Sequence, residues 1–292
     1  MPEPMAIAGA GRMGQALGRL LRERGESIAA VASRSPERAA EAAAFIGGGA
    51  KAATYAEIAQ HAAHTLIAVP DDAIAPVAGM LAEAGMRCGT ALHTSGAYGP
   101  EALAALAEAG VACGTLHPLQ TVASPQEGAR VLPGVAFAID GAPAAIAWAE
   151  RLVAVLGGMP LHVPAASRPL YHAAAVMASN YPMALIFAAV MPMEEAGVGE
   201  SIARRALEPL ARTSLENAFR LGPVAALTGP IARGDADTVR THLAALAAAP
   251  ATVERLYRAL GLATLEIARR RGLAEAQAGV IEELLRKGER RD

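Results

Sequence analysis

The chain has 292 residues, of which 53% are hydrophobic and 3% are aromatic, and its formal net charge is -2. A chain of this length can bury a sizeable core and form two domains. Its charges are spread without a basic cluster, so nucleic acid is not an expected partner. Two cysteines, Cys88 and Cys113, are too few for a disulfide framework or a thiolate metal site, so we expect a cytoplasmic protein without a metal.

A glycine motif follows the first expected strand. Residues 5–8 are apolar, residues 9–14 read Gly-x-Gly-x-x-Gly, and a helical pattern comes next, which is typical of a unit that binds a dinucleotide. Gly9 would permit the tight turn, Gly11 would let the backbone approach a pyrophosphate, and Gly14 would let the helix pack on the strand. A purely structural turn is the alternative. The expected cofactor contacts here are Gly9, Gly11, Arg12, Met13 and Gly14.

Strand and helix patterns then alternate. Further strands are expected at residues 27–33, 65–69, 90–93, 111–116, 135–139 and 160–163, with helices at 36–45, 73–84, 100–108 and 142–156. This alternation predicts an α/β fold with a doubly wound parallel sheet. From residue 168 the pattern is helical, at 168–196, 199–220, 235–248, 250–271 and 274–287. We therefore expect a dinucleotide-binding domain at residues 1–165 and an all-helical domain for substrate and dimerisation at residues 166–292.

The stretch from His172 to Met193 contains no Asp, Glu, Lys or Arg and is long enough to span a bilayer. Its polar side chains and two prolines, Pro182 and Pro192, would leave groups without hydrogen-bond partners in lipid. We therefore expect a buried central helix and no membrane partner. The apolar faces of the helical domain favour a homodimer.

The residues after the second strand indicate which nicotinamide cofactor binds. Sites for NAD place an Asp or Glu about 20 residues beyond the glycine motif, whereas this chain has Ser33, Arg34 and Ser35. A guanidinium flanked by hydroxyls suits the 2′-phosphate of NADP, and Arg38 could add a second positive contact. NADP is therefore the expected cofactor. In the alternative interpretation, Ser35 only caps a helix and Arg34 is a solvated charge.

Ligands of open parallel sheets bind beyond the carboxyl ends of the strands. Three segments follow such ends, and each contains residues suited to chemistry. Asp71 is expected to cap the next helix rather than to react. Each histidine could instead be a hydrogen-bonded structural residue. The candidates are Val69, Pro70 and Asp71 for the cofactor, His93, Ser95 and His117 for catalysis, and Gln120 for the substrate.

Polar residues on the long helix form another group of candidates. His172, Ser179 and Asn180 lie within one stripe of an otherwise apolar helix. Because buried polar groups need partners, the stripe is expected to face the sheet or a ligand, or to form a structural network. His172 and Asn180 are catalytic candidates, and Tyr171 is a secondary candidate on its position alone.

The segment at residues 228–235 links two helices of the second domain. Asp235 is expected to be an N-cap. Thr228 and Arg233 are candidates for holding a substrate oxygen or carboxylate.

Together these motifs resemble Rossmann-like proteins that carry the domain of unknown function 2520. The resemblance covers nearly the whole chain and is carried by the glycine motif, Ser33-Arg34-Ser35, His93-Thr94-Ser95-Gly96-Ala97, His117-Pro118-Leu119-Gln120, Tyr171-His172-Ala173-Ala174 and Leu227-Thr228-Gly229-Pro230. Such proteins are similar to ketopantoate reductase, pyrroline-5-carboxylate reductase and the coenzyme F420-dependent NADP reductases. The resemblance implies an NADP-dependent reductase whose substrate is not settled.

Ketopantoate reductases carry a lysine on the hinge helix, with asparagines one and two turns later. The corresponding residues here are His172, Val176 and Asn180, and the chain's only lysines, Lys51 and Lys287, lie outside that helix. A histidine would therefore have to supply the proton.

The sequence thus predicts hydride transfer from NADPH to a small carbonyl or imine in a cleft between the domains, with a 2-oxo acid such as ketopantoate as one possibility. His172 or His117 would donate the proton, and Asn180 and Ser95 would bond to the oxygen. One alternative is a non-catalytic NADP-binding sensor or partner protein. Another is a deazaflavin-dependent NADP reductase, although so few aromatic residues do not suggest an aromatic-lined slot.

Overall fold

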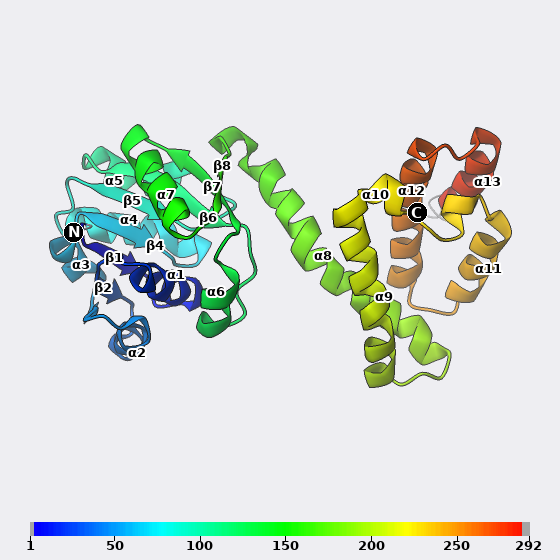
Figure 1. The fold of residues 1–292 in the computed structure, drawn as a ribbon, viewed down its shortest axis with the longest axis horizontal. Coiled ribbons are helices and arrows are strands. Elements are labelled where there is room, and N and C mark those ends of the chain that lie inside the picture. Colours follow the sequence, from blue (N-terminus) through cyan, green and yellow to red (C-terminus); the bar gives the residue numbers. More distant parts are fainter. Residues whose placement is uncertain (1–2, 288–292) are drawn as a thin grey trace. The chain divides into compact units, whose positions relative to one another are not determined.

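The computed structural model describes residues 3–287 (Figure 1). It divides into two compact units, Met1–Ser179 and Asn180–Asp292, which part inside the long helix α8 (Arg168–Glu195). The expected domain boundary at residue 165 stays a prediction.

An eight-stranded sheet forms the centre of the first unit, in the order β3-β2-β1-β4-β5-β6-β7-β8. The first six strands are parallel, and the order reverses between β1 and β4, where nucleotide-binding sheets open a crevice. This confirms the expected α/β class. The strands are β1 (Met5–Ala8), β2 (Ile28–Ala32), β3 (Lys51–Ala53), β4 (His64–Ile67), β5 (Thr90–His93), β6 (Ala112–Pro118), β7 (Ala136–Gly141) and β8 (Met159–His162).

Strands β7 and β8 depart from the expected parallel direction. They are parallel to each other, but β7 pairs antiparallel with β6. The connection between β6 and β7 contains only the short helix α6 (Pro125–Val131) and returns to the edge where β6 ended, so that the N–H of Leu119 donates to the carbonyl of Ala136 at 2.8 Å. Because the chain re-enters the sheet at the edge where β6 ended, β7 runs back along β6 in the antiparallel direction.

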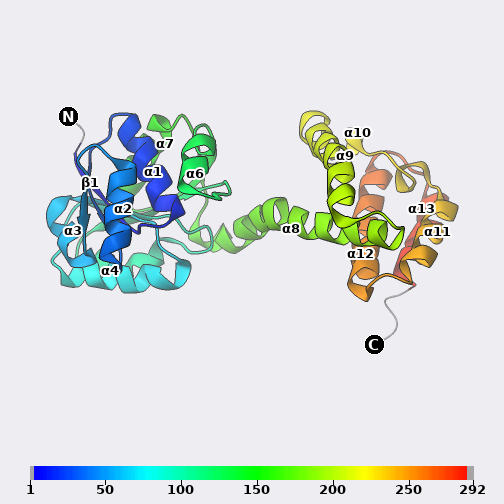
Figure 2. The ribbon, with the colours of Figure 1, turned by 90° about the horizontal axis from the view of Figure 1, so that it is seen from below.

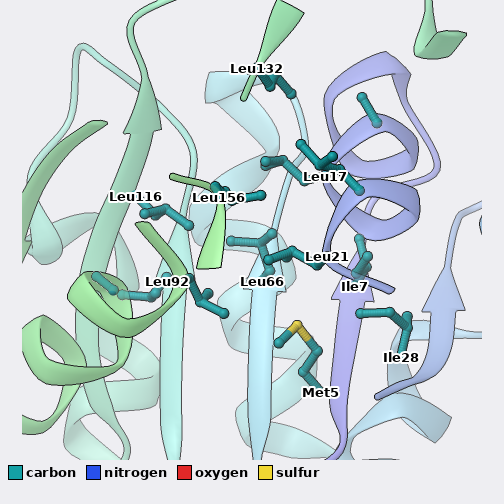
Figure 3. Packing of buried hydrophobic residues seen from close by; sticks show 14 of the residues in the cluster. Met5, Ile7, Leu17, Leu21, Ile28, Leu66, Leu92, Leu116, Leu132 and Leu156 are labelled. Atoms are coloured by element: carbon teal, nitrogen blue, oxygen red, sulfur yellow. The ribbon is translucent and has the colours of Figure 1, made fainter. Parts of the chain in front are cut away.

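Helices cover both faces of the sheet (Figure 2). Met5 and Ile7 of β1 point to one face, where they pack with Leu17 and Leu21 of α1 (Figure 3). Because side chains alternate along a strand, the intervening alanines of β1 face the other layer. The first face carries α1 (Arg12–Glu23), α2 (Pro36–Ile46) and α7 (Pro143–Val155), and the second carries α3 (Tyr55–His61), α4 (Ile74–Glu83) and α5 (Ala104–Glu108).

Two helix starts agree with the sequence pattern. The hydroxyl of Ser35 accepts the N–H of Arg38 at 3.2 Å at the start of α2. The carboxylate of Asp235 likewise accepts the N–H of Thr238 at 3.0 Å at the start of a later helix, so both expected N-caps are confirmed.

The expectation that Asp71 caps the next helix is wrong. Asp71 begins a short 3-10 turn, Asp71–Ala73, that precedes α4. This extra turn makes Ala73 the residue before α4, and no side chain among the described residues caps that helix. Asp71 is therefore placed too early in the chain to reach the first amides of α4.

Every regular element that the structure describes in the second unit is helical, as expected. Its core is formed by α11, α12 and α13, with Leu243, Leu265 and Ile281 among the buried side chains. Besides the end of α8, the helices are α9 (Glu200–Leu221), α10 (Pro223–Ala226), α11 (Ala236–Leu246), α12 (Ala251–Arg270) and α13 (Glu275–Arg286).

Helix α8 is not the buried helix that its composition predicts. It is long and apolar enough to cross a membrane on length and composition alone, yet few of its residues are buried within the chain. Met183 and Phe187, one turn apart, are 70% and 67% exposed. An apolar composition predicts burial only where a covering surface exists, and the described part of a single chain supplies none along most of α8.

Candidate functional site

Two positions in the turn between β1 and α1 must be glycine because neighbouring backbone atoms leave no room for a side chain. Gly9 has a φ of +127°, and a Cβ there would lie 2.2 Å from the carbonyl oxygen of Ala68. A Cβ on Gly14 would lie 2.1 Å from the carbonyl oxygen of Gly9. Both positions therefore exclude side chains, since the strand, turn and helix are in close contact.

Gly11 is different, because a Cβ there would meet nothing nearer than the carbonyl oxygen of Ala68, at 4.0 Å. It is the N-cap residue of α1, and no side chain of the described residues caps that helix. Free amides at a helix start with open space before them make an anion site. This arrangement fits a pyrophosphate.

A cavity of about 550 Å³ lies in front of this turn, at the carboxyl ends of β1, β2 and β4. Its lining includes two arginines, Arg34 and Arg38, and one carboxylate, Asp72. The positive excess suits a phosphate group, so the residues present fit NADP. Of the residues expected from the sequence, the lining includes Gly11, Ser33, Arg34, Ser35, Arg38, Val69 and Pro70.

Five expected cofactor contacts, Gly9, Arg12, Met13, Gly14 and Asp71, are absent from that lining. The guanidinium of Arg12 instead donates to the carbonyl of Ala123 at 3.2 Å. Sequence reasoning missed Tyr55, the first residue of α3, which lines the cavity. A signal for it existed, because Thr54 and Glu57 form a capping box that marks the start of α3.

A second group of polar residues gathers at the carboxyl ends of β5 and β6, where α8 begins. The side chain of Arg168 is fully buried and donates to the carbonyl of Ser95 at 3.2 Å and to the hydroxyl of Thr115. One turn later, Tyr171 shares a hydrogen bond of 2.8 Å with Nδ1 of His117. The start of α8 is thus fixed to both strands.

His93 is held within its own loop. Its ring is fully buried; Nε2 donates to the carbonyl of Gly99 at 2.9 Å, and Nδ1 accepts the N–H of Ser95 at 3.2 Å. The Ser95 hydroxyl accepts the N–H of Ala97 at 3.1 Å. Burial is the main cause that lowers the pKa of His93. With both nitrogens engaged, this ring organises the loop.

His117 and His172 both lie next to Gly96. Their ring centroids are 6.5 Å apart, and a Cβ on Gly96 would lie 2.7 Å from Nε2 of His117 and 2.9 Å from Nδ1 of His172. That Nδ1 is buried and has no partner among the described residues. Burial, followed by the charge of Arg168, lowers the pKa of His117 from 6.5 to about 4, so this ring is uncharged at neutral pH. We define His117, Tyr171 and His172 as the histidine cluster.

The remaining candidates are Asn180, Gln120, Thr228 and Arg233. Asn180 begins the second unit, and Ser179 donates to the carbonyl of Ala175 at 2.7 Å. Thr228 lines an apolar cavity of about 380 Å³ within the second unit, whose lining does not include Arg233. The side chain of Gln120 accepts the N–H of the next residue at 2.9 Å. The roles predicted for these residues stay predictions.

Comparison with known proteins adds to this geometry. Residues 4–87 match the family of NADP oxidoreductases described as coenzyme F420-dependent, and residues 135–264 match the domain of unknown function 2520 (DUF2520). The chain is an NADP oxidoreductase with a DUF2520 domain. This confirms the resemblance and the cofactor expected from the motifs. No curated protein matches this NADP oxidoreductase.

Several solved structures share the fold of this NADP oxidoreductase. A Bacteroides fragilis protein assigned as an NADP oxidoreductase is 25% identical over 92% of this chain and 99% of its own, with a TM-score of 0.71. A Thermotoga maritima protein is 23% identical over 91% and 99% of the two chains, with a TM-score of 0.70. An imine reductase from Streptomyces aurantiacus is 17% identical over 98% and 94%, with a TM-score of 0.60.

Proposed function

We propose that this NADP oxidoreductase reduces a small carbonyl or imine compound at the histidine cluster. The observation that carries the proposal is the convergence of His117 and His172 on Gly96, at the same edge of the sheet as the nucleotide cavity. Hydride transfer to a carbonyl or imine needs a bound donor and a nearby group that supplies a proton. These two requirements correspond to the two polar regions at that edge.

NADPH supplies the hydride when bound. The substrate carbon gains that hydride, and the electron pair of its double bond moves to the oxygen or nitrogen, which then needs a proton. We assign this proton to His172, whose buried Nδ1 lacks a partner among the described residues. His117, which is uncharged at neutral pH, would hydrogen-bond the same atom through Nε2. The roles of Asn180 and Ser95 as oxygen ligands stay predictions.

The test is a stopped-flow assay of NADPH oxidation with a panel of 2-oxo acids, ketones and cyclic imines. His172→Ala should lower turnover about 100-fold or more while NADPH still binds. The matched control is His162→Ala, because His162 is exposed on β8 and pairs with Glu150 at 3.2 Å. Turnover of no compound by the wild-type protein would exclude the reaction and leave a non-catalytic NADP-binding protein.

The match of residues 4–87 to a coenzyme F420-dependent family supports a second candidate, hydride exchange between NADPH and a deazaflavin. The same assay distinguishes the two, since a deazaflavin that is reduced while every carbonyl and imine stays unreacted would select the second candidate.

We also propose that the helical unit forms a homodimer. Phe219 on α9 is 88% exposed, and Met183 and Phe187 on α8 are similarly uncovered. Large apolar side chains that are exposed in this way favour a protein partner. Light scattering should give the mass of a dimer, and Phe219→Glu should lower it, whereas Val280→Glu on α13 should not. Recovery of the protein with lipid vesicles in a flotation assay would instead indicate a membrane surface.

A further inference from the structure

Arg168 is a fully buried cation at the first position of α8. Within residues 3–287, no carboxylate forms an ion pair with it, and its buried Nε has no hydrogen-bond partner. Burial of a charged group without an ion pair is unfavourable. A neutral side chain of similar length would fill the same space, so packing alone does not account for an arginine here.

The surroundings of Arg168 form a regular pattern. Arg168 and Tyr171 are three residues apart in α8 and therefore share one face of the helix. Thr115 and His117 are two residues apart in β6 and share one face of the strand. Arg168 donates to Thr115, and Tyr171 bonds to His117 at 2.8 Å. The guanidinium is thus fixed one helical turn from the bond between Tyr171 and His117.

The charge of Arg168 acts on both partners of that bond. Burial is the largest cause that lowers the pKa of His117. The charge of Arg168 lowers it further, and so do the neighbouring His172 and His93. The charge of Arg168 also opposes the rise that burial causes in the pKa of Tyr171, which makes the phenolic hydroxyl a better donor. Both effects favour the same arrangement, with the hydroxyl as donor and Nδ1 of His117 as acceptor.

Two carboxylates act on Arg168 from beyond ion-pair distance. Asp140 belongs to β7, where it lies opposite Thr115 in the sheet register, and Glu101 belongs to the turn Pro100–Leu103. Asp140 accepts the N–H of Gly141 at 2.9 Å, and Glu101 accepts the N–H of Gly99 at 2.9 Å. Since both bond to backbone groups of their own segments, the charge of Arg168 stays available to act on His117.

We propose that Arg168 is a positioning residue that directs the Tyr171 hydroxyl to donate to Nδ1 of His117 and so places the ring proton on Nε2, beside Gly96. His117 then presents a neutral N–H toward the substrate oxygen or nitrogen, and His172 is left to supply the proton. A neutral imidazole can polarise a carbonyl without giving up its own proton. This inference rests on the proposed carbonyl or imine reduction.

The test is nitrogen-15 NMR of the histidine rings in the full chain, titrated from about pH 8 to about pH 4. The His117 signals are assigned by their loss in His117→Asn. In the wild-type protein we expect a neutral ring at neutral pH with the proton on Nε2. Arg168→Met should raise the protonation midpoint by about one unit or more and mix the two tautomers, whereas Arg168→Lys should retain the wild-type pattern.

A wild-type ring that is charged at neutral pH, or that carries its proton on Nδ1, overturns the proposal even if no Arg168 variant folds. An Arg168→Met protein with wild-type signals overturns it as well. Tyr171→Phe supplies a milder variant, because this side chain is only partly buried. It should abolish the preference for the Nε2 tautomer while the ring stays neutral, and an unchanged tautomer ratio would contradict the proposal.

These spectra require no substrate, so the inference and the proposed function fail separately. Absence of turnover with every carbonyl and imine would remove the reaction but leave the tautomer as measured. Turnover together with a proton on Nδ1 would retain the reaction and remove the role of Arg168.

Discussion

The nucleotide cavity and the histidine cluster lie at the same edge of the sheet, but their polar groups are held in opposite ways. In the cavity, Arg34 and Arg38 are exposed, and the space before Gly11 is open to 4.0 Å. In the cluster, Arg168 is fully buried, and His117 is bonded to Tyr171. The polar groups of the cavity are thus available to a ligand, whereas those of the histidine cluster are already bonded to other groups of the chain.

This difference determines how each region should respond to change. Charges that face an open cavity act mainly on the molecule that binds, so their removal should alter affinity more than stability. Groups that are buried and bonded to one another contribute to both folding and chemistry, so changes there should alter both. Matched variants in the two regions test this distinction.

The largest effect is expected within the glycine turn, where Gly14→Ala should lower the free energy of unfolding by about 3 kcal/mol or more, because its Cβ would lie 2.1 Å from the Gly9 oxygen. Gly11→Ala should lower stability by only about 1 kcal/mol, since its Cβ has room and alanine is merely a poorer N-cap residue than glycine. It should nonetheless weaken NADPH binding. Urea denaturation and calorimetry measure the two quantities, and a Gly11→Ala protein that binds NADPH normally would contradict the ligand role of that space.

The histidine cluster should make stability depend on pH. The pKa of His117 falls from 6.5 to about 4 on folding, so the unfolded chain binds its proton more readily. The resulting stability is complete above about pH 6.5 and is lost as the pH falls toward 4, by up to about 3 kcal/mol in total. His93, whose pKa is also lowered by burial, adds to the same trend.

His117→Gln should therefore flatten the loss of stability with falling pH, as measured by urea denaturation at several pH values. The matched variant His162→Gln changes an exposed histidine and should leave the slope as in the wild-type protein. Equal slopes in all three proteins would show that folding does not lower the pKa of His117.

The same contrast explains which parts of the molecule could be predicted from sequence. The glycine turn and the Ser33–Ser35 segment follow directly after strands, so local patterns located both. The direction of β7 was not predictable in this way. The direction depends on where a short helix delivers the chain relative to β6, which no periodicity records.

The histidine cluster could be predicted only in part. His117 and His172 were candidates because of their places at a strand end and on the long helix. Arg168 was missed, because its role depends on contacts with Ser95 and Thr115, more than fifty residues away in sequence. The exposure of α8 was missed as well, since composition shows that a surface is apolar without showing what covers it.

A change at Gly96 tests the order within the cluster. The Cβ of Gly96→Ala would lie 2.7 Å from His117 and 2.9 Å from His172, so at least one ring must move. A displacement of about 1 Å in a catalytic group costs on the order of 100-fold in turnover. NADPH affinity should stay normal, because the cavity is lined by other residues. The control is Gly279→Ala on α13, where nothing lies within 4 Å of the added carbon.

The smallest effect is expected at the exposed arginine of the cavity. Arg34→Ala should weaken NADPH binding about 10-fold, the loss of a charge-assisted contact, and should leave NADH binding nearly unchanged. The free energy of unfolding should also stay nearly unchanged, because Arg34 is exposed and forms no ion pair that the described residues show.

Ser35→Ala provides the matched control for Arg34, since the neighbouring side chain caps α2 through its bond to the N–H of Arg38. Loss of this cap should lower the free energy of unfolding by about 1 kcal/mol. Ser35→Ala should therefore affect folding, whereas Arg34→Ala should affect binding of the cofactor. If Arg34→Ala instead weakened NADPH and NADH equally, the guanidinium would not distinguish the 2′-phosphate. The exposed charges of the cavity would then contribute to general attraction, and selectivity would have to come from another part of its wall.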